Sequence, residues 1–236
     1  MTLERILETE VLDTYEEARD YDAMDHSEVN RRFVDDLLAL GNLGTDVLDL
    51  CTGTARIPIE LCRRFAECRV MAADLSAYML DLARLNIEIA GQIQRIQLEQ
   101  ADAKRLPYAA AYFDVVMSNG SLHHIPEPLV VLREVVRVLR PGGVCFLRDL
   151  LRPDSEEAVA ELVANYAGEA NERQQAKFAD SLRASLTLAE IRALIEQLGF
   201  DPQTVQMTSD RHWTWTTRKP GATSGPSATA LTRISS

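Results

Sequence analysis

Hydrophobic and polar positions along the chain follow two periods, and together these predict the secondary structure. Between residues 45 and 150, short apolar runs are each followed by a turn and a stretch with helical spacing. The expected strands are residues 47–50, 70–73, 93–98, 113–117 and 144–147. The helices expected between them are residues 57–65, 76–90 and 127–139. Strands that alternate with helices indicate βαβ units, in which helices cover both faces of a parallel sheet.

Two further regions flank this alternation. Ahead of it, apolar residues recur at helical spacing from Ser27, and Gly41 closes the stretch. After it, helices are expected near residues 155–178 and 187–198, followed by strand-like segments at 204–207 and 212–217. The gap between the last two segments is too short for a crossover helix, so they should pair as an antiparallel hairpin.

These elements predict an α/β fold. We expect a doubly wound, mostly parallel sheet of seven strands, with the last strand antiparallel at the edge and helices on both faces. Residues 45–217 would form this core, as one domain with a helical lead-in or lid at residues 1–44. From residue 218 the chain lacks an apolar period. Residues 218–236 are therefore expected to be a flexible tail, because they cannot bury enough surface to offset the entropy of ordering.

Composition narrows the class of protein. The 236 residues carry 25 Lys+Arg and 36 Asp+Glu, a net charge of −11, which disfavours nucleic acid as a partner. No apolar run reaches the roughly 18 residues that span a bilayer, and the acidic N-terminus is unlike a signal or transit peptide. The four cysteines form no CxxC pair, as expected of reduced thiols. We therefore expect a cytoplasmic protein without membrane association, whose oligomeric state the sequence leaves open.

Three acidic residues lie where successive predicted strands end: Asp49, Asp74 and Asp102. In an open parallel sheet, ligands bind outside the carboxyl ends of the strands. A carboxylate at Asp74 can accept both hydroxyls of a ribose, and one at Asp102 can accept from an exocyclic amine. The turn after the first strand has one glycine, Gly53, whereas a pyrophosphate fingerprint needs three, and no Walker pattern occurs. The sequence predicts a nucleoside site without a phosphate chain.

Structural roles compete with these functional ones. Asp49 could cap the following helix, and Asp74 could be a turn carboxylate before Ser76. Met79 suits the core as well as it suits contact with a base.

Five segments resemble, in order, the motifs of class I S-adenosylmethionine-dependent methyltransferases. They are VLDLCTGTA (47–55), ADLSAYML (73–80), QADAKRLP (100–107), FDVVMSN (113–119) and LRPGG (139–143). The resemblance covers residues 45–151. It implies a Rossmann-like fold with S-adenosylmethionine (SAM) as the cofactor and S-adenosylhomocysteine (SAH) as its product.

The resemblance assigns the methionine end of the cofactor to the first and fourth motifs. Asp49 and the backbone of Cys51, Thr52 and Gly53 would hold this end, and Asn119 would lie near the amino group. The chain departs from the family pattern at Cys51 and Ala55, because the family commonly has glycine at both positions. A Cβ atom restricts left-handed backbone geometry there.

The resemblance assigns the nucleoside end to the second and third motifs. Asp74 would bind the ribose hydroxyls, and Leu75 and Met79 would pack on the adenine. Asp102 would accept from the adenine amine, with the backbone of Ala103 beside it.

The acceptor side has fewer signals. His124 is the candidate catalytic base, which is needed only if the acceptor must lose a proton. We expect the adjacent His123 side chain to diverge from it, so the two make a poor metal pair and no metal is predicted. His123, Arg148 and Arg152 are candidates for binding the acceptor, although both arginines could instead pair with nearby acids. Tyr21 is expected to fold over the cofactor from the lead-in, the alternative being ordinary helix packing.

The predicted function is transfer of a methyl group from SAM to a small-molecule acceptor by in-line displacement, in which the protein mainly aligns the acceptor and excludes water. One alternative is a non-catalytic partner subunit that only binds SAM, which the residues at positions 51 and 55 motivate. Another is a methyltransferase that acts on RNA or protein. The sequence does not identify the acceptor atom.

Overall fold

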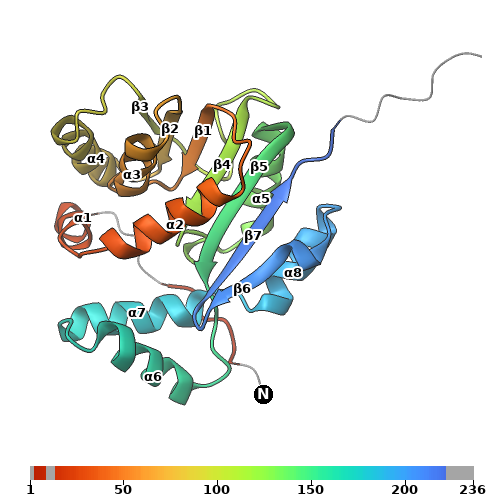
Figure 1. Ribbon diagram of the computed structural model, residues 1–236. Helices are drawn as coiled ribbons and strands as arrows, with labels where there is room; N and C mark the ends of the chain where they lie inside the picture. The colour runs from red at the N-terminus through yellow and green to blue at the C-terminus, as the bar shows by residue number, and fades with distance from the viewer. Residues whose placement is uncertain (1–2, 9–13, 222–236) are drawn as a thin grey trace, which may run out of the picture.

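The computed structural model describes residues 3–8 and 14–221, with seven strands and eight α-helices in those ranges (Figure 1). The strands are β1 (Asp46–Leu50), β2 (Arg69–Asp74), β3 (Ile96–Gln100), β4 (Phe113–Asn119), β5 (Leu139–Leu150), β6 (Val205–Ser209) and β7 (His212–Arg218). The helices are α1 (Tyr15–Asp22), α2 (Ser27–Ala39), α3 (Arg56–Arg64), α4 (Ala77–Ile89), α5 (Pro128–Val138), α6 (Glu156–Ala167), α7 (Glu172–Ala184) and α8 (Leu188–Gln197). Two short 3-10 turns are η1 (Leu122–His124) and η2 (Pro202–Thr204).

All seven strands join one sheet in the order β3-β2-β1-β4-β5-β7-β6. Strands β1 to β5 pair in parallel, and β7 is antiparallel to both of its neighbours. The mixed seven-strand sheet confirms the predicted fold class. The prediction that the antiparallel strand lies at the edge was wrong, because β7 lies between β5 and β6. Burial explains this order: β7 carries the fully buried Trp213 and Trp215, whereas most of β6 is exposed.

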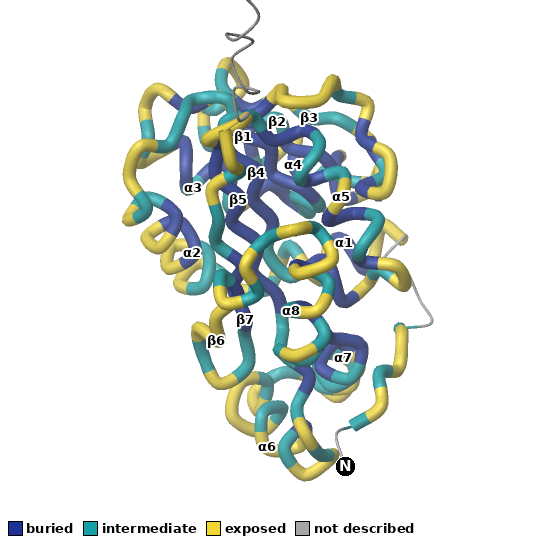
Figure 2. Tube along the Cα trace, turned by 90° about the vertical axis from the view of Figure 1, so that its right-hand side faces the viewer, coloured by how far each residue is buried: buried dark blue, intermediate teal, exposed yellow. Residues whose placement is uncertain are grey.

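Helices cover both faces of the sheet, as the apolar pattern predicts. Helices α2, α3 and α4 pack on one face and contribute to one hydrophobic cluster, while α5 and α8 pack on the other. Alternate residues of β5 point to opposite faces, so Phe146 belongs to the first cluster and Leu147 to the second. The central strands β1, β4 and β5 are buried along most of their length, and exposure is concentrated on the outer helix faces, the loops and the outer strand β6 (Figure 2).

Helix starts follow the capping signals in the sequence. Ser76 accepts a hydrogen bond from the Met79 amide at 3.3 Å and begins α4. Thr187 and Glu190 form a reciprocal capping box at the start of α8. Residues 155–178 form not one long helix but α6 and the start of α7, and these two helices lie beyond the carboxyl ends of β4 and β5 (Figure 1). No helix in the described ranges is long and apolar enough to cross a membrane.

The ordered core extends slightly past the predicted boundary at residue 217. Strand β7 includes Arg218, and the Lys219 amide donates to the Gly143 carbonyl at 2.9 Å. The Lys219 ammonium also donates to the carbonyls of Val136 and Leu139 at 2.6 and 2.7 Å. The rest of the predicted tail, residues 222–236, lies outside the described residues.

Candidate cofactor and acceptor site

Two adjoining cavities lie at the carboxyl ends of the parallel strands. The larger, which we call the main cavity, has a volume of about 290 Å³ and is lined by Asp74 and Asp102, among other residues. The smaller, the side cavity, has a volume of about 40 Å³ and is lined by Asp49 and Thr52. Tyr21, Cys51 and Asn119 line both cavities. The structure therefore brings the predicted acids to one region, with Asp49 on the far side of a shared wall.

The turn between β1 and α3 is built from alternating left-handed residues. Cys51, Gly53 and Ala55 have φ values of +56°, +56° and +61°. Two of the three carry a Cβ atom, and left-handed geometry costs such a residue about 1 kcal/mol. The turn is fixed to β2, since the Thr52 amide donates to the Ala73 carbonyl at 2.9 Å.

Asp74 is held by the backbone on both sides. Its carboxylate accepts from the Gly53 amide at 2.8 Å and from the Ser76 amide at 2.9 Å. Burial raises the pKa of Asp74, and these two hydrogen bonds oppose the rise. The carboxylate is thus fixed in orientation at the wall of the main cavity.

Asp49 is more deeply buried than Asp74, since it is 2% exposed and lies within β1. It accepts a hydrogen bond from the Thr52 hydroxyl at 2.5 Å. Burial raises its pKa to about 7, the Thr52 hydrogen bond opposes the rise, and the nearby Asp74 charge adds to it. Asp49 therefore titrates close to neutral pH.

Another part of the main cavity's lining is apolar. Met79 is buried and Leu75 is 53% exposed, and both line the cavity together with Ala103. Asp102 lies at the exposed rim, where the Lys104 ammonium is 2.9 Å from its carboxylate. The predicted nucleoside-end residues, Asp74 included, thus line one cavity.

Tyr21 lies over the glycine-containing turn. A Cβ atom placed on Gly53 would be 3.6 Å from the Tyr21 ring. Helix α1 is tied to the core beside it, because Asp22 accepts from Arg56 at 2.9 and 3.0 Å and from Asn86 at 3.0 Å. The lead-in therefore reaches the site through the last turn of α1.

The two histidines do not diverge, contrary to the prediction. Their ring centroids are 4.0 Å apart, and each ring is hydrogen-bonded to a carboxylate of its own. His123 is buried, and its Nδ1 is 2.6 Å from Asp149. His124 lines the main cavity, and its Nδ1 is 2.8 Å from Glu8. Burial lowers the pKa of His123, but its contacts with Asp149 outweigh that effect and the net shift is upward.

Glu8 was not anticipated from the sequence. It lines the main cavity, and its carboxylate and the two imidazoles bring donor atoms within 4.8 Å of one another. No spacing or motif connects Glu8 to residues more than 110 positions away, so only the fold could reveal this contact. Asp149, at the carboxyl end of β5, is one of the nearby acids with which the arginines could have paired, but its carboxylate contacts His123 instead.

Arg148 and Arg152 do not lie where the acceptor-binding prediction requires. The Arg148 guanidinium donates to Asp36 at 2.6 Å and to Thr214 at 2.9 Å. The Arg152 guanidinium donates to Glu190 at 2.5 Å and to a backbone carbonyl at 3.0 Å. Neither is among the described residues that line the main cavity. Both point from the end of β5 toward acids on neighbouring helices, so we do not retain them in the acceptor site.

Comparison with known proteins adds a second line of support. A family model described as a methyltransferase domain matches residues 48–147. The demethylmenaquinone methyltransferase of Lactobacillus johnsonii is 30% identical over 166 residues, which cover 66% of this chain and 68% of that relative. The 27-O-demethylrifamycin SV methyltransferase of Amycolatopsis mediterranei is 31% identical over 167 residues, which cover 70% of this chain and 57% of that relative.

Solved structures agree on the fold. A SAM-dependent methyltransferase from Aquifex aeolicus matches with a TM-score of 0.61 and 15% identity, over 86% of this chain and 97% of that one. The sheet order, the acids at the strand ends and the relative that is 30% identical lead to one conclusion. The chain belongs to the class I SAM-dependent methyltransferases, and its cofactor is SAM.

Proposed function

We propose that this protein transfers the methyl group of SAM to a small-molecule acceptor that enters the main cavity. The observation that carries the proposal is the lining of this one cavity, which joins Asp74 and Asp102 to His124. Its only Lys or Arg among the described residues is Lys104, which is already paired with Asp102. An RNA acceptor needs cations for its phosphates, so the lining favours a small molecule. The two named relatives act on a menaquinone precursor and a rifamycin by their names.

The residues present fit the cofactor. We assign the ribose hydroxyls to Asp74, whose orientation the backbone fixes, and the adenine to the wall that includes Met79 and Leu75. Asp102 and the Ala103 backbone would meet the adenine edge. A bare backbone at Gly53 allows close approach without a Cβ clash.

The methionine end is assigned to the side cavity. Asp49 and Thr52 line it, and Asn119 and Cys51 connect it to the main cavity. An ionised Asp49 carboxylate would attract the positive charges of the methionine end. Tyr21 would cover the junction of the two cavities and exclude water.

When bound, SAM supplies an electrophilic methyl group and leaves as SAH. The chain's own task is to align the acceptor and exclude water, which supply most of the acceleration in a displacement of this kind. We assign the general base to His124, which lines the main cavity beside Gly120 and Ser121. A base of this kind raises the reaction rate about 10²–10⁴-fold when the acceptor must lose a proton. His123, which is buried against Asp149, is assigned a supporting role.

Calorimetry with SAH tests the cofactor site without knowledge of the acceptor. We expect the wild type to bind, and Asp74→Asn to bind at least about tenfold more weakly, a loss of roughly 1.4 kcal/mol. Asp81→Asn is the matched control, because Asp81 is exposed on α4 and its replacement removes the same charge. Absence of SAH binding in the wild type, or equal affinities for all three proteins, contradicts the proposed site.

Turnover separates the enzyme from a non-catalytic partner subunit. Purified protein is incubated with methyl-labelled SAM and a panel of small phenols, quinols and alcohols, and labelled product is separated from SAM. Label transfer to a panel member supports the proposal. SAH binding without any label transfer favours the non-catalytic alternative, which the left-handed Cys51 and Ala55 motivate.

A further inference from the structure

We propose that residues 3–8 form a strap that completes the acceptor end of the site, in which Glu8 is the positioning residue for His124. The inference deepens the proposed function and rests on it for the role of His124. The contacts that define the strap are observed in the structure and do not depend on that role. They fix which nitrogen of His124 is free to take a proton, and so they indicate the chemical class of the acceptor.

The strap is anchored through Arg5 by backbone carbonyls of two segments, the η1 region and α7. The Arg5 guanidinium donates to Ala184 at the end of α7 at 2.6 Å, to Ile125 at 3.1 Å and to His123 at 3.4 Å. The Ile6 amide also donates to the Arg183 carbonyl of α7 at 3.2 Å. A planar guanidinium with several fixed donors suits such a bridge. The strap thereby links η1 to α7.

Glu8 uses both of its oxygens. One lies 2.8 Å from Nδ1 of His124, and the other accepts from the Ser181 hydroxyl of α7 at 2.6 Å. The Glu8 side chain is 10% exposed. Burial alone would raise its pKa, but the hydrogen bonds from His124 and Ser181 lower it to about 2. Glu8 is therefore ionised at neutral pH.

An ionised carboxylate can only accept hydrogen bonds. The Nδ1 atom of His124 must therefore carry the proton in the Glu8–His124 contact, and the neutral ring keeps its lone pair on Nε2. This is the arrangement that orients a histidine for general-base catalysis, with a carboxylate behind the ring to fix the tautomer and stabilise the imidazolium that forms. Glu8 thus prepares His124 to remove a proton.

The acceptor class follows from that preparation. A thioether or tertiary amine needs no base, whereas a hydroxyl must lose its proton as its oxygen is methylated. In the step we infer, the O–C bond forms as the C–S bond breaks, and the hydroxyl proton moves to Nε2 of His124. The strap therefore indicates an acceptor that loses a proton, and among these we infer one with a hydroxyl group, either a phenol or an alcohol.

A metal site is the competing use of the same side chains, since Glu8, His123 and His124 lie close enough to share an ion. An ion there would have to displace the Glu8–His124 hydrogen bond and compete with Ser181 for Glu8. His123 already uses Nδ1 for Asp149. The observed contacts therefore favour the hydrogen-bonded arrangement.

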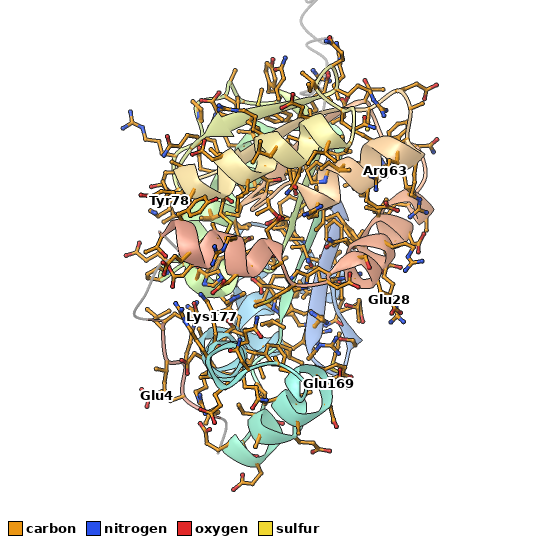
Figure 3. The ribbon with its side chains drawn as sticks, turned by 90° about the vertical axis from the view of Figure 1, so that its left-hand side faces the viewer. Glu4, Glu28, Arg63, Tyr78, Glu169 and Lys177 are labelled. Carbon is orange, nitrogen blue, oxygen red and sulfur yellow. The ribbon has the colours of Figure 1, made fainter. Side chains whose placement is uncertain are left out.

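The test is the tautomer of His124, read from ¹⁵N imidazole shifts in protein labelled at histidine. In the wild type we expect the Nδ1–H form. Glu8→Ala should convert His124 to a mixture of tautomers, and Glu8→Asp, which keeps the charge on a shorter side chain, should restore part of the Nδ1–H form. Glu4→Ala is the matched control, because Glu4 lies exposed on the same strap (Figure 3). Wild-type tautomers in Glu8→Ala would overturn the proposal.

A second variant guards against a local folding effect. Arg5→Ala leaves Glu8 and His124 intact and releases the strap, so it should produce the same tautomer mixture as Glu8→Ala. With a hydroxyl acceptor from the panel, Glu8→Ala should lower kcat by 10-fold or more and leave the KM for SAM unchanged. Unchanged kcat, or one equivalent of metal in the purified protein by mass spectrometry, would count against the strap. Absence of SAH binding by the wild type would instead contradict the proposed function.

Discussion

Asp49 couples the protonation state of the site to folding. In the unfolded chain an aspartate has its usual pKa near 3.9, whereas burial raises the pKa of Asp49 to about 7 in the folded protein. Between these two values the folded state binds more protons than the unfolded state, so the free energy of unfolding must fall as the pH rises. Above pH 7 this contribution no longer changes.

Asp49→Asn should remove that part of the pH dependence. Between pH 5 and pH 7 we expect the wild type to lose on the order of 2 kcal/mol more stability than the variant, measured by urea unfolding at each pH. Asp81→Asn, at an exposed position of α4, should behave like the wild type. Parallel stability curves for wild type and Asp49→Asn would show that this carboxylate is ionised throughout the range.

Single residues also show how far the site could be predicted from the sequence. Asp74 and Asp102 were predicted as site residues because a parallel sheet places its strand ends along one edge, and both line the main cavity. Glu8 was missed because its contact with His124 depends on the path of the strap, for which the sequence holds no periodic signal. Arg148 was misplaced because its partner, Asp36, lies on α2, and the sequence alone does not tell which helix packs beside β5.

Strand β7 offers a matched pair of tests at the scale of an element. Trp213 and Trp215 are both fully buried. The Trp215 indole donates to the Thr204 hydroxyl at 3.1 Å, whereas the Trp213 indole N–H has no hydrogen-bond partner among the described residues. Replacement by phenylalanine removes similar volume at each position, so the difference between the two variants isolates the hydrogen bond.

We expect Trp215→Phe to lower the free energy of unfolding by about 1 kcal/mol more than Trp213→Phe. Urea unfolding followed by circular dichroism measures both. Equal losses would mean that the Trp215–Thr204 hydrogen bond contributes nothing, or that water satisfies the Trp213 indole.

The elements themselves were predicted well where periodicity was strong. The αβ alternation of residues 45–150 and the terminal hairpin were found from apolar spacing alone. The position of β7 was not, because periodicity shows that a strand is buried but does not name its neighbours. The signal that the sequence does hold is the pair of tryptophans in the last strand, next to a polar strand, and this contrast would favour an interior place for β7 over β6.

At the scale of the whole molecule, the cofactor should stabilise the fold by mass action. SAH at 100 times its Kd should add about 2.7 kcal/mol to the free energy of unfolding. For a chain of this size that corresponds to a rise in Tm of roughly 5–10 °C. Differential scanning calorimetry at increasing SAH concentration checks the value. Asp74→Asn should need a higher SAH concentration for the same rise, and Asp81→Asn should not.

The interior place of β7 also has a consequence for synthesis on the ribosome. β7 follows β6 in the chain, yet it pairs with β5 over residues 144–150 and separates β5 from β6. The outer edge of β5 therefore stays without its partner until the chain up to Arg218 has emerged. A nascent chain that ends before this point presents an open strand edge and the apolar surface that Trp213 and Trp215 cover in the finished protein, which are the features that chaperones bind and that promote aggregation.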